Sequence, residues 1–204
     1  MNINLIESAR LEIDVTLIKH QVIVIDYDFT ISRFDTSKAV LFWAYDMARS
    51  GINLSRLRRP RGMFFKKISD AMNRTNMHEI ELVEDILLRS NSSQIDELFI
   101  FLLSLDYNTS FVKLILEMIC IGKNVQIISG GHYKIVRRLV CEQFACVDSS
   151  IKITGQIPKG PRIKGKKHRF CTVNPSDCCL ITDNSEDLEF TGWGQVFFLK
   201  YNSI

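Results

Sequence analysis

The chain of 204 residues is 46% hydrophobic and 24% charged, with only 10 glycines and 4 prolines. This composition excludes collagen-like, low-complexity and fully disordered proteins, and the length suffices for one sizeable core, alone or with a small accessory domain. The net charge of +3 is too small to indicate extensive nucleic-acid binding, so no nucleic-acid partner is expected.

No apolar run approaches the roughly 18–20 residues that span a bilayer. The N-terminal segment contains acidic residues and lacks the apolar stretch of a signal peptide. We therefore expect a cytoplasmic protein without a transmembrane segment.

The first half of the chain predicts two strands followed by helices. Residues 11–18 alternate apolar and polar side chains, which favours a strand, and residues 22–25 are consecutive β-branched residues, typical of a buried parallel strand. From about residue 36 to residue 108, apolar residues recur mainly at helical spacing. Within this part, residues 54–67 carry six basic side chains and predict a loop.

The second half alternates helical and strand-like patterns. Residues 111–122 and 132–144 have helical periodicity. Short apolar segments predicted as strands are 125–128, 151–154, 178–182 and 196–199. This alternation predicts an α/β fold with a Rossmann-like parallel sheet flanked by helices.

Polar clusters follow three of the predicted strands. They comprise Asp26, Asp28 and Thr30, then Ser129, then Asp183 and Asp187. Because ligands of parallel sheets bind at the carboxyl ends of the strands, these clusters are expected to converge on one site.

The residue types in these clusters suit phosphoryl transfer. Asp26, Asp28 and Asp183 form an oxygen-rich set of the kind that Mg²⁺ prefers. A carboxylate there can attack phosphorus, and a second one two residues later can protonate the leaving oxygen and then activate water. Ser129 and the two glycine amides after it, at the expected start of a helix, can hold phosphate oxygens. A lysine can neutralise the charge on the transferring group.

The same motifs resemble those of the haloacid dehalogenase (HAD) superfamily of phosphohydrolases. The family's first motif stands here as VIVI-DYDFT, its second as VQIIS and its fourth as CLIT-DNSED, in family order. The phosphoserine-phosphatase-like branch is the most similar, because it has a helical cap, a Ser followed by a helix, and a D-T pair shortly after the first motif (here Asp35-Thr36).

The resemblance implies a core domain formed by residues 1–34 and 109–204, with an inserted helical C1 cap at residues 35–108. It further implies a Mg²⁺-dependent phosphomonoesterase that forms an aspartyl-phosphate. The substrate would be a small organic phosphate, with sugar and lipid-linked phosphates included.

Residue roles follow from the same resemblance. Asp26 would be the nucleophile, and Asp28 the general acid and base. Phosphate binding is assigned to Thr30, which would also orient the aspartate pair, and to Ser129, Gly130 and a lysine. The metal site is assigned to Asp26, Asp28 through its carbonyl, Asp183 and, in support, Asp187.

Two positions depart from the family pattern. The lysine lies in GPRIKGKKHRF, where Lys166, four residues before Phe170, is preferred over Lys167 and Lys164. Phe29 stands where the family usually has Gly, and it would narrow the pocket for the leaving group.

Alternatives remain open at this stage. The same site would also suit a phosphotransferase that uses an alcohol as acceptor. The departures above favour a catalytically decayed binding or regulatory module, whereas the intact Asp26, Asp28, Asp183 and Asp187 oppose it. The basic residues within 56–67 predict either a solvated loop or a surface for an anionic substrate or an anionic membrane. His132 is a further residue that would lie near the phosphate.

Overall fold

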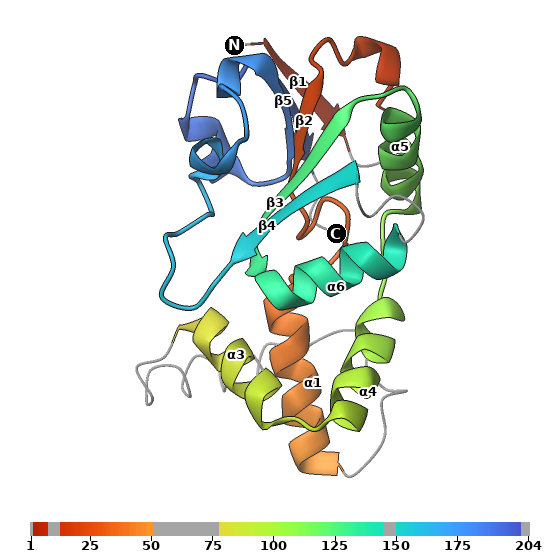
Figure 1. Ribbon diagram of the computed structural model, residues 1–204, viewed down its shortest axis with the longest axis vertical. Coiled ribbons are helices and arrows are strands. Elements are labelled where there is room, and N and C mark those ends of the chain that lie inside the picture. The colour runs from red at the N-terminus through yellow and green to blue at the C-terminus, as the bar shows by residue number, and fades with distance from the viewer. Residues whose placement is uncertain (1, 8–12, 51–77, 145–149, 201–204) are drawn as a thin grey trace.

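A six-stranded parallel sheet forms the centre of the computed structural model, which describes residues 2–7, 13–50, 78–144 and 150–200 (Figure 1). The strand order is β1-β6-β5-β2-β3-β4, and every neighbouring pair is parallel. The strands are β1 (Asn2–Glu7), β2 (Val22–Ile25), β3 (Asn124–His132), β4 (Ile151–Gln156), β5 (Cys178–Thr182) and β6 (Gln195–Lys200). The sheet confirms the predicted α/β class.

The N-terminal part differs from the prediction. Where a strand was expected within residues 11–18, Val15–Leu17 form a short 3-10 helix, η1. Its cause is Asp14, whose side chain accepts hydrogen bonds from the Thr16 amide and hydroxyl and so competes with strand pairing. The strand of this region is instead β1, which pairs with β6 at the edge of the sheet.

The two faces of the sheet are buried in separate apolar clusters, because successive side chains of a strand point to opposite sides. Ile23 and Ile25 belong to the larger cluster, with residues of α5 (Thr109–Cys120) and α6 (Tyr133–Gln143). Val22 and Val24 belong to the smaller cluster on the other face, with Trp193. Both helices lie on one side of the sheet (Figure 1).

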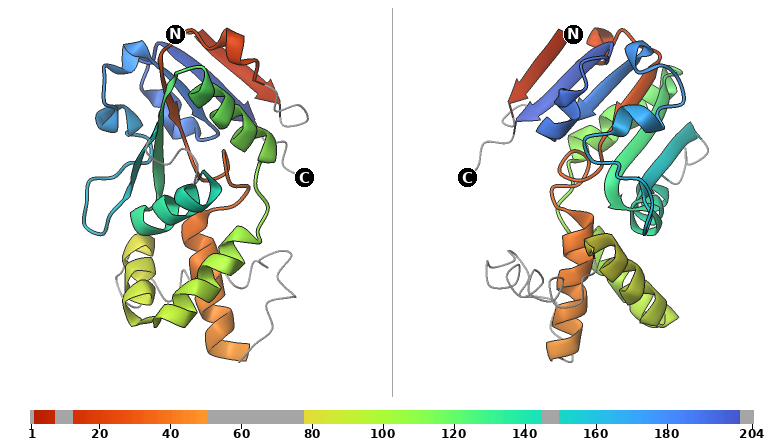
Figure 2. Two further views of the ribbon diagram at one scale, coloured as in Figure 1. Left: turned by 45° about the vertical axis from the view of Figure 1, so that its right-hand side comes forward. Right: turned by 90° about the vertical axis from the view of Figure 1, so that its left-hand side faces the viewer.

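Among the described residues between β2 and β3, three further helices are present, which agrees with the mainly helical pattern there. They are α1 (Thr36–Ser50), α3 (Glu79–Arg89) and α4 (Ser92–Leu103). Figure 2 shows them grouped beyond one end of the sheet. The basic stretch 54–67, and with it the predicted anionic contact surface at 56–67, lies outside the described residues.

The two connections between these helices and the rest of the chain run side by side. Ser32, in the first, forms an antiparallel bridge with Tyr107, in the second. The Asn108 amide donates to the Ile31 carbonyl at 2.9 Å, and the Arg33 amide donates to the Asp106 carbonyl at 3.1 Å. The junction is therefore a paired two-strand link. The division into domains at residues 35 and 108 stays a prediction.

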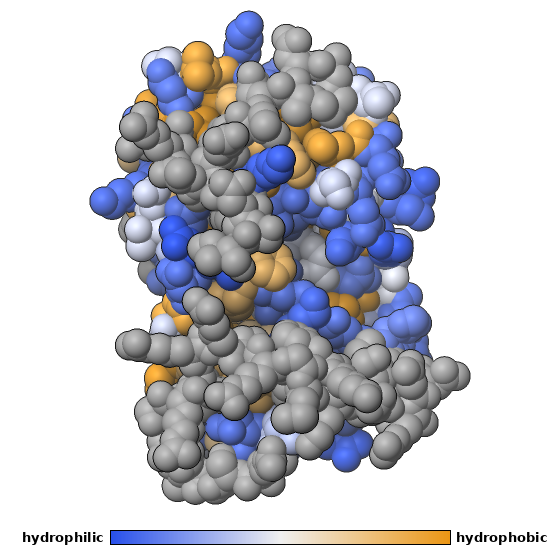
Figure 3. Space-filling model, turned by 180° about the vertical axis from the view of Figure 1, so that it is seen from behind, coloured by the Kyte–Doolittle hydropathy of each residue, from blue (hydrophilic) through white to orange (hydrophobic). Residues whose placement is uncertain are grey.

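The described surface is mixed in character. On the rear face, hydrophilic residues cover much of the described area between smaller hydrophobic groups (Figure 3). Within the described ranges, no helix combines the length and apolar character that crossing a membrane requires.

Candidate functional site

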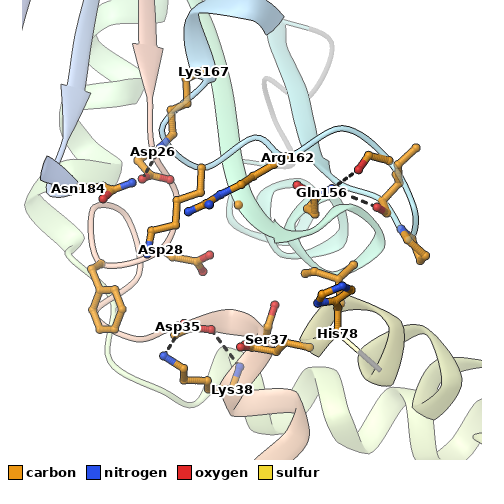
Figure 4. Close-up of a pocket in the computed structure, with 18 of the residues that line it drawn as sticks. Asp26, Asp28, Asp35, Ser37, Lys38, His78, Gln156, Arg162, Lys167 and Asn184 are labelled. Carbon is orange, nitrogen blue, oxygen red and sulfur yellow. Dashed lines mark hydrogen bonds and ion pairs between the residues drawn. The ribbon is translucent and has the colours of Figure 1, made fainter. Parts of the chain in front are cut away.

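The three polar clusters meet because their strands are neighbours in the sheet, in the order β5-β2-β3. Asp26 directly follows β2, Asp183 directly follows β5, and Ser129 lies within β3. A cavity of about 890 Å³ opens at this edge, and residues of α1 and α3 form part of its wall (Figure 4). Convergence at the carboxyl ends of the strands is therefore as the sequence predicted.

Asp26 is held by an ion pair and by a backbone amide. The Lys167 ammonium lies 2.8 Å from Asp26 Oδ2, and the Tyr27 amide donates to Oδ1 at 2.8 Å (Figure 4). Only 6% of Asp26 is exposed. Burial raises the pKa of this carboxyl, and the charge of Lys167 opposes that rise. Oδ2 of Asp26 therefore faces the ammonium group of Lys167.

Lys167 is shared between two carboxylates. Its ammonium also contacts Asp187 Oδ2, at 2.5 Å, and its side chain is 1% exposed. Burial lowers the pKa of Lys167, but Asp26 and Asp187 raise it more, so the net shift is upward. The lysine is therefore a fixed buried cation beside Asp26.

The preference for Lys166 is thereby corrected to Lys167. Lys166 is exposed, and Lys164, which lines the cavity, lies 3.6 Å from Glu186 on the surface. The reason is local: Gly165 has a positive φ of 69°, and the 3-10 helix η4 (Lys167–Phe170) starts directly at Lys167. The four-residue spacing of an α-helix therefore does not apply here.

Asp187 differs from its predicted place among the metal ligands. Its second oxygen, Oδ1, accepts from the Gly165 amide at 3.1 Å, and Oδ2 accepts from the Thr182 hydroxyl at 2.8 Å. Together with the contact to Lys167, these hydrogen bonds engage both carboxylate oxygens of Asp187 with groups of the protein. We therefore count Asp187 as a residue that positions Lys167.

Asp28 lies beside Asp26 and is oriented by two donors. The Thr36 amide, at the start of α1, donates to Oδ1 at 2.9 Å, and the Ser129 hydroxyl donates to Oδ2 at 3.3 Å. Burial, reinforced by the charges of Asp35 and Asp26, raises the pKa of Asp28 to about 8. A carboxyl with this pKa is mostly protonated at neutral pH and can donate a proton.

Ser129 is placed by the strand rather than by a helix start. β3 continues through Gly130 and Gly131 to His132, with an irregular register between Ser129 and His132, and α6 begins only at Tyr133. The expected helix start at the two glycines is therefore wrong. The Gly131 amide donates to the Ser129 hydroxyl at 2.9 Å, which fixes that side chain at the strand end.

Thr30 and Asp183 form the remaining part of the site. The Thr30 hydroxyl donates to Asp183 Oδ1 at 3.1 Å, so it orients Asp183 rather than the Asp26–Asp28 pair. Burial, followed by the charge of Asp26, raises the pKa of Asp183 to about 7. The carboxylates of Asp26 and Asp183 are thus both shielded from water, and they repel each other when both are ionised.

These donors fit a magnesium ion. In the described parts of the chain, no group of three His, Cys, Asp or Glu side chains forms a metal cluster. Magnesium nevertheless needs only one or two carboxylates with waters and substrate oxygens. Asp26 and Asp183, with the backbone carbonyl of Asp28, supply such a set of hard oxygen donors.

Glu79 was not identified from the sequence, and the contact that His132 makes was not expected. Glu79 of α3 lines the cavity, and burial, with the charge of Asp35, raises its pKa to about 7. His132 was expected near the phosphate, but its Nε2 lies 2.9 Å from Glu84 of α3. Only the pairing of distant segments reveals these two contacts, since neither residue belongs to a local motif.

Comparison with solved structures places the fold. No protein-family model matches the sequence, and no curated protein sequence matches it either. A protein of unknown function from Bordetella pertussis Tohama I aligns over 88% of this chain and 99% of its own, at TM-score 0.58 and 11% identity. Phosphoserine phosphatase in its apo form aligns over 87% and 85%, at 0.51 and 14%. Protein tyrosine kinase A of Mycobacterium tuberculosis aligns over 88% and 83%, at 0.50 and 12%.

At these identities the likeness concerns the fold. The α/β fold that the resemblance implies is thus confirmed: this chain and phosphoserine phosphatase share a similar overall architecture.

Proposed function

We propose that this chain is a Mg²⁺-dependent phosphomonoesterase that uses Asp26 as its nucleophile. The observation that carries the proposal is the buried ion pair between Asp26 and Lys167, which is 2.8 Å long. It lies at the edge of the sheet where Asp28 and Asp183 are also found. Buried ionisable groups with shifted pKa values that share a cavity are typical of catalytic sites.

The first step is attack on phosphorus. A bond forms between an Asp26 carboxylate oxygen and phosphorus, and the bond from phosphorus to the leaving oxygen breaks. Asp28, protonated at neutral pH, gives its proton to that oxygen and releases an alcohol. Burial raises the pKa of Asp26, and Lys167 opposes that rise and so favours the ionised carboxylate that attacks.

The second step reverses the proton transfer. Asp28, now ionised, removes a proton from water, which attacks the aspartyl-phosphate. The bond between phosphorus and the Asp26 oxygen breaks, and inorganic phosphate leaves. Ser129 and the Gly130 amide are proposed to hold the phosphate oxygens during both steps.

Magnesium belongs to the same proposal. When bound, it would neutralise charge on the phosphoryl oxygens and align them for attack. Asp26, Asp183 and the Asp28 carbonyl would hold it, and Thr30 already orients Asp183 through the 3.1 Å hydrogen bond.

The helical segment at residues 35–108 is proposed to act as a cap. Ser37 and Glu79, from α1 and α3, line the cavity opposite Asp26. Glu84 of α3 lies 2.6 Å from Lys134 of α6, which holds the segment against the rest of the chain. A cap in this place would exclude water and select the leaving group. A small phosphorylated substrate and a cytoplasmic location remain part of the proposal.

The test is phosphate release from a panel of phosphomonoesters, with Mg²⁺ and with EDTA. We compare the wild type with Asp26→Asn and with Asp177→Asn, an exposed aspartate before β5 that serves as a matched control. We expect activity that requires Mg²⁺, survives in the control and falls by at least about 1,000-fold in Asp26→Asn.

Other outcomes identify the alternatives. Diversion of phosphate to an added alcohol would indicate the phosphotransferase. No turnover on any substrate, together with no Mg²⁺-dependent binding of beryllium fluoride, would contradict the proposal and favour the binding module.

A further inference from the structure

Phe29 occupies a backbone position that does not suit a phenylalanine. The Thr30 amide donates to the Tyr27 carbonyl at 3.3 Å, which closes a tight turn with Phe29 as its third residue. Its φ is +57°, in the left-handed region where side chains with a Cβ are disfavoured. Glycine or asparagine normally fills such a position.

Packing does not compensate for this strain. Phe29 is 42% exposed, and it belongs to neither of the two apolar clusters of the described core. An aromatic ring that is left largely in water contributes little to folding. Strained residues of this kind concentrate at functional sites, where the strain serves a ligand.

The location of Phe29 indicates which part of a ligand it would meet. It lines the same cavity as Asp26 and Asp28, and it directly follows Asp28, the proposed proton donor to the leaving oxygen. The ring therefore belongs to the same cavity lining as Asp28, so a leaving group that takes its proton from Asp28 is the part of the substrate that Phe29 would meet.

Other parts of the cavity lining contribute a second ring and apolar surface. His78, at the start of α3, contributes a second ring to the lining, and Ile157, which is 51% exposed, contributes apolar surface. A volume of about 890 Å³ is large enough for a ring together with a phosphate. Aromatic pairs gain additional energy when they stack with an offset or meet edge to face.

We propose that the substrate is an aryl phosphate, in which a flat ring is bonded directly to the phosphate oxygen, and that Phe29 contacts this ring. The inference rests on the proposed phosphatase function and specifies its substrate class. Phe29 would then be a specificity residue: it recognises the leaving group and takes no part in proton transfer.

The test compares phenyl phosphate with cyclohexyl phosphate, which differ in the flatness of the ring. We measure kcat/KM for both in the wild type, Phe29→Leu, Phe29→Tyr and Phe198→Leu. Phe198 is half-buried on β6 and does not line the cavity, so it is the matched control. The ratio between the two substrates removes their different intrinsic reactivity when the variants are compared.

We expect Phe29→Leu to lower the phenyl-to-cyclohexyl ratio by about 3- to 10-fold, as the loss of an aromatic pair would. Phe29→Tyr and Phe198→Leu should keep the wild-type ratio. A ratio within twofold of the wild type in Phe29→Leu would overturn the inference and leave the phosphatase proposal standing. Failure of the wild type to hydrolyse any phosphomonoester would overturn both.

Thermal unfolding of Phe29→Gly provides a measurement that does not depend on activity. Because glycine adopts a positive φ freely, this variant should be at least as stable as the wild type. A fall in Tm of more than about 5 °C would show that the ring supports the fold, and it would overturn the argument that the ring is kept for a ligand.

Discussion

Replacement of Lys167 by methionine tests the central charge arrangement of the site. Methionine nearly preserves the length of the side chain but removes an ammonium that lies 2.8 Å from Asp26 and also contacts Asp187. The two carboxylates are 6% and 2% exposed, so water cannot replace the lost cation. Breaking a buried ion pair by removing one partner typically costs about 3–5 kcal/mol. We expect a loss of stability in this range.

The adjacent lysine provides the control. Lys166 is exposed, so Lys166→Met should change the free energy of unfolding by no more than about 0.5 kcal/mol. Urea unfolding in EDTA measures both variants without a divalent cation. With an m value of about 2.5 kcal/mol per M, the Lys167→Met midpoint should fall by roughly 1–2 M near pH 8.

The stability deficit of Lys167→Met should also change with pH in a defined direction. Burial raises the pKa of Asp26 above its ordinary value of 3.8, so the native state binds the proton more tightly than the unfolded state. Such a group reduces stability as the pH rises from the unfolded towards the folded pKa. Lys167 lowers the pKa of Asp26 in the folded protein. Its loss therefore raises that folded pKa further and widens the pH interval over which stability falls. The deficit of Lys167→Met should therefore be smaller near pH 5 than near pH 8.

Two results would refute this reasoning. Equal urea midpoints for the two lysine variants near pH 8 would show that the buried cation is not needed by its partners. A deficit that grows towards pH 5 would show that the carboxylates do not carry the cost.

Two further variants test the positioning of Asp28 and the link between α3 and α6. A Cβ on Gly131 would lie 2.8 Å from Asp28 Oδ2, whereas one on Gly130 would meet nothing nearer than 3.6 Å. Gly131→Ala should lower kcat by about 100-fold and Gly130→Ala by much less, which steady-state phosphate release measures. Lys134 lowers the pKa of Glu84 in the folded protein. The pair therefore stabilises the fold at pH values above 4.5, the ordinary pKa of glutamate, and this stabilisation is lost as the pH falls through the pKa of Glu84 in the folded protein. Urea unfolding of Glu84→Gln should show a deficit of about 0.5–1 kcal/mol near pH 7 that is absent near pH 3; an equal deficit at both values would contradict it.

Local sequence patterns were sufficient where hydrophobic runs end in charged residues. The segments VIVI and CCLIT predict buried strands, and because parallel strands end at one edge, the carboxylates after them had to meet. The predicted elements at residues 22–25 and 178–182 match β2 and β5. The positions of these two strands, and the meeting of the carboxylates that follow them, could be predicted without knowledge of any side-chain contact.

Features that depend on distant partners or on local turn geometry could not be predicted. β1 exists because it pairs with β6, almost 200 residues away, and its own sequence has only a weak strand pattern. The choice between Lys166 and Lys167 depends on the left-handed conformation of Gly165 and on a 3-10 helix, in which side chains repeat every three residues. Phe29 was noticed as a departure, but its positive φ is visible only in the structure.

The charges that affect stability at this site are also those of the proposed reaction. Asp26 is buried and Asp183 is partly buried, and they lie close enough that Asp26 raises the pKa of Asp183, so the two carboxylates repel each other in the absence of a metal. Lys167 relieves this repulsion from one side of Asp26, and Asp187 holds Lys167 in place. A divalent cation bound by Asp26 and Asp183 would relieve it from the other side and stabilise the fold by mass action. Lys167 therefore favours the ionised form of Asp26, the proposed nucleophile, in the absence of a metal, and its contribution to stability should be largest in the metal-free protein.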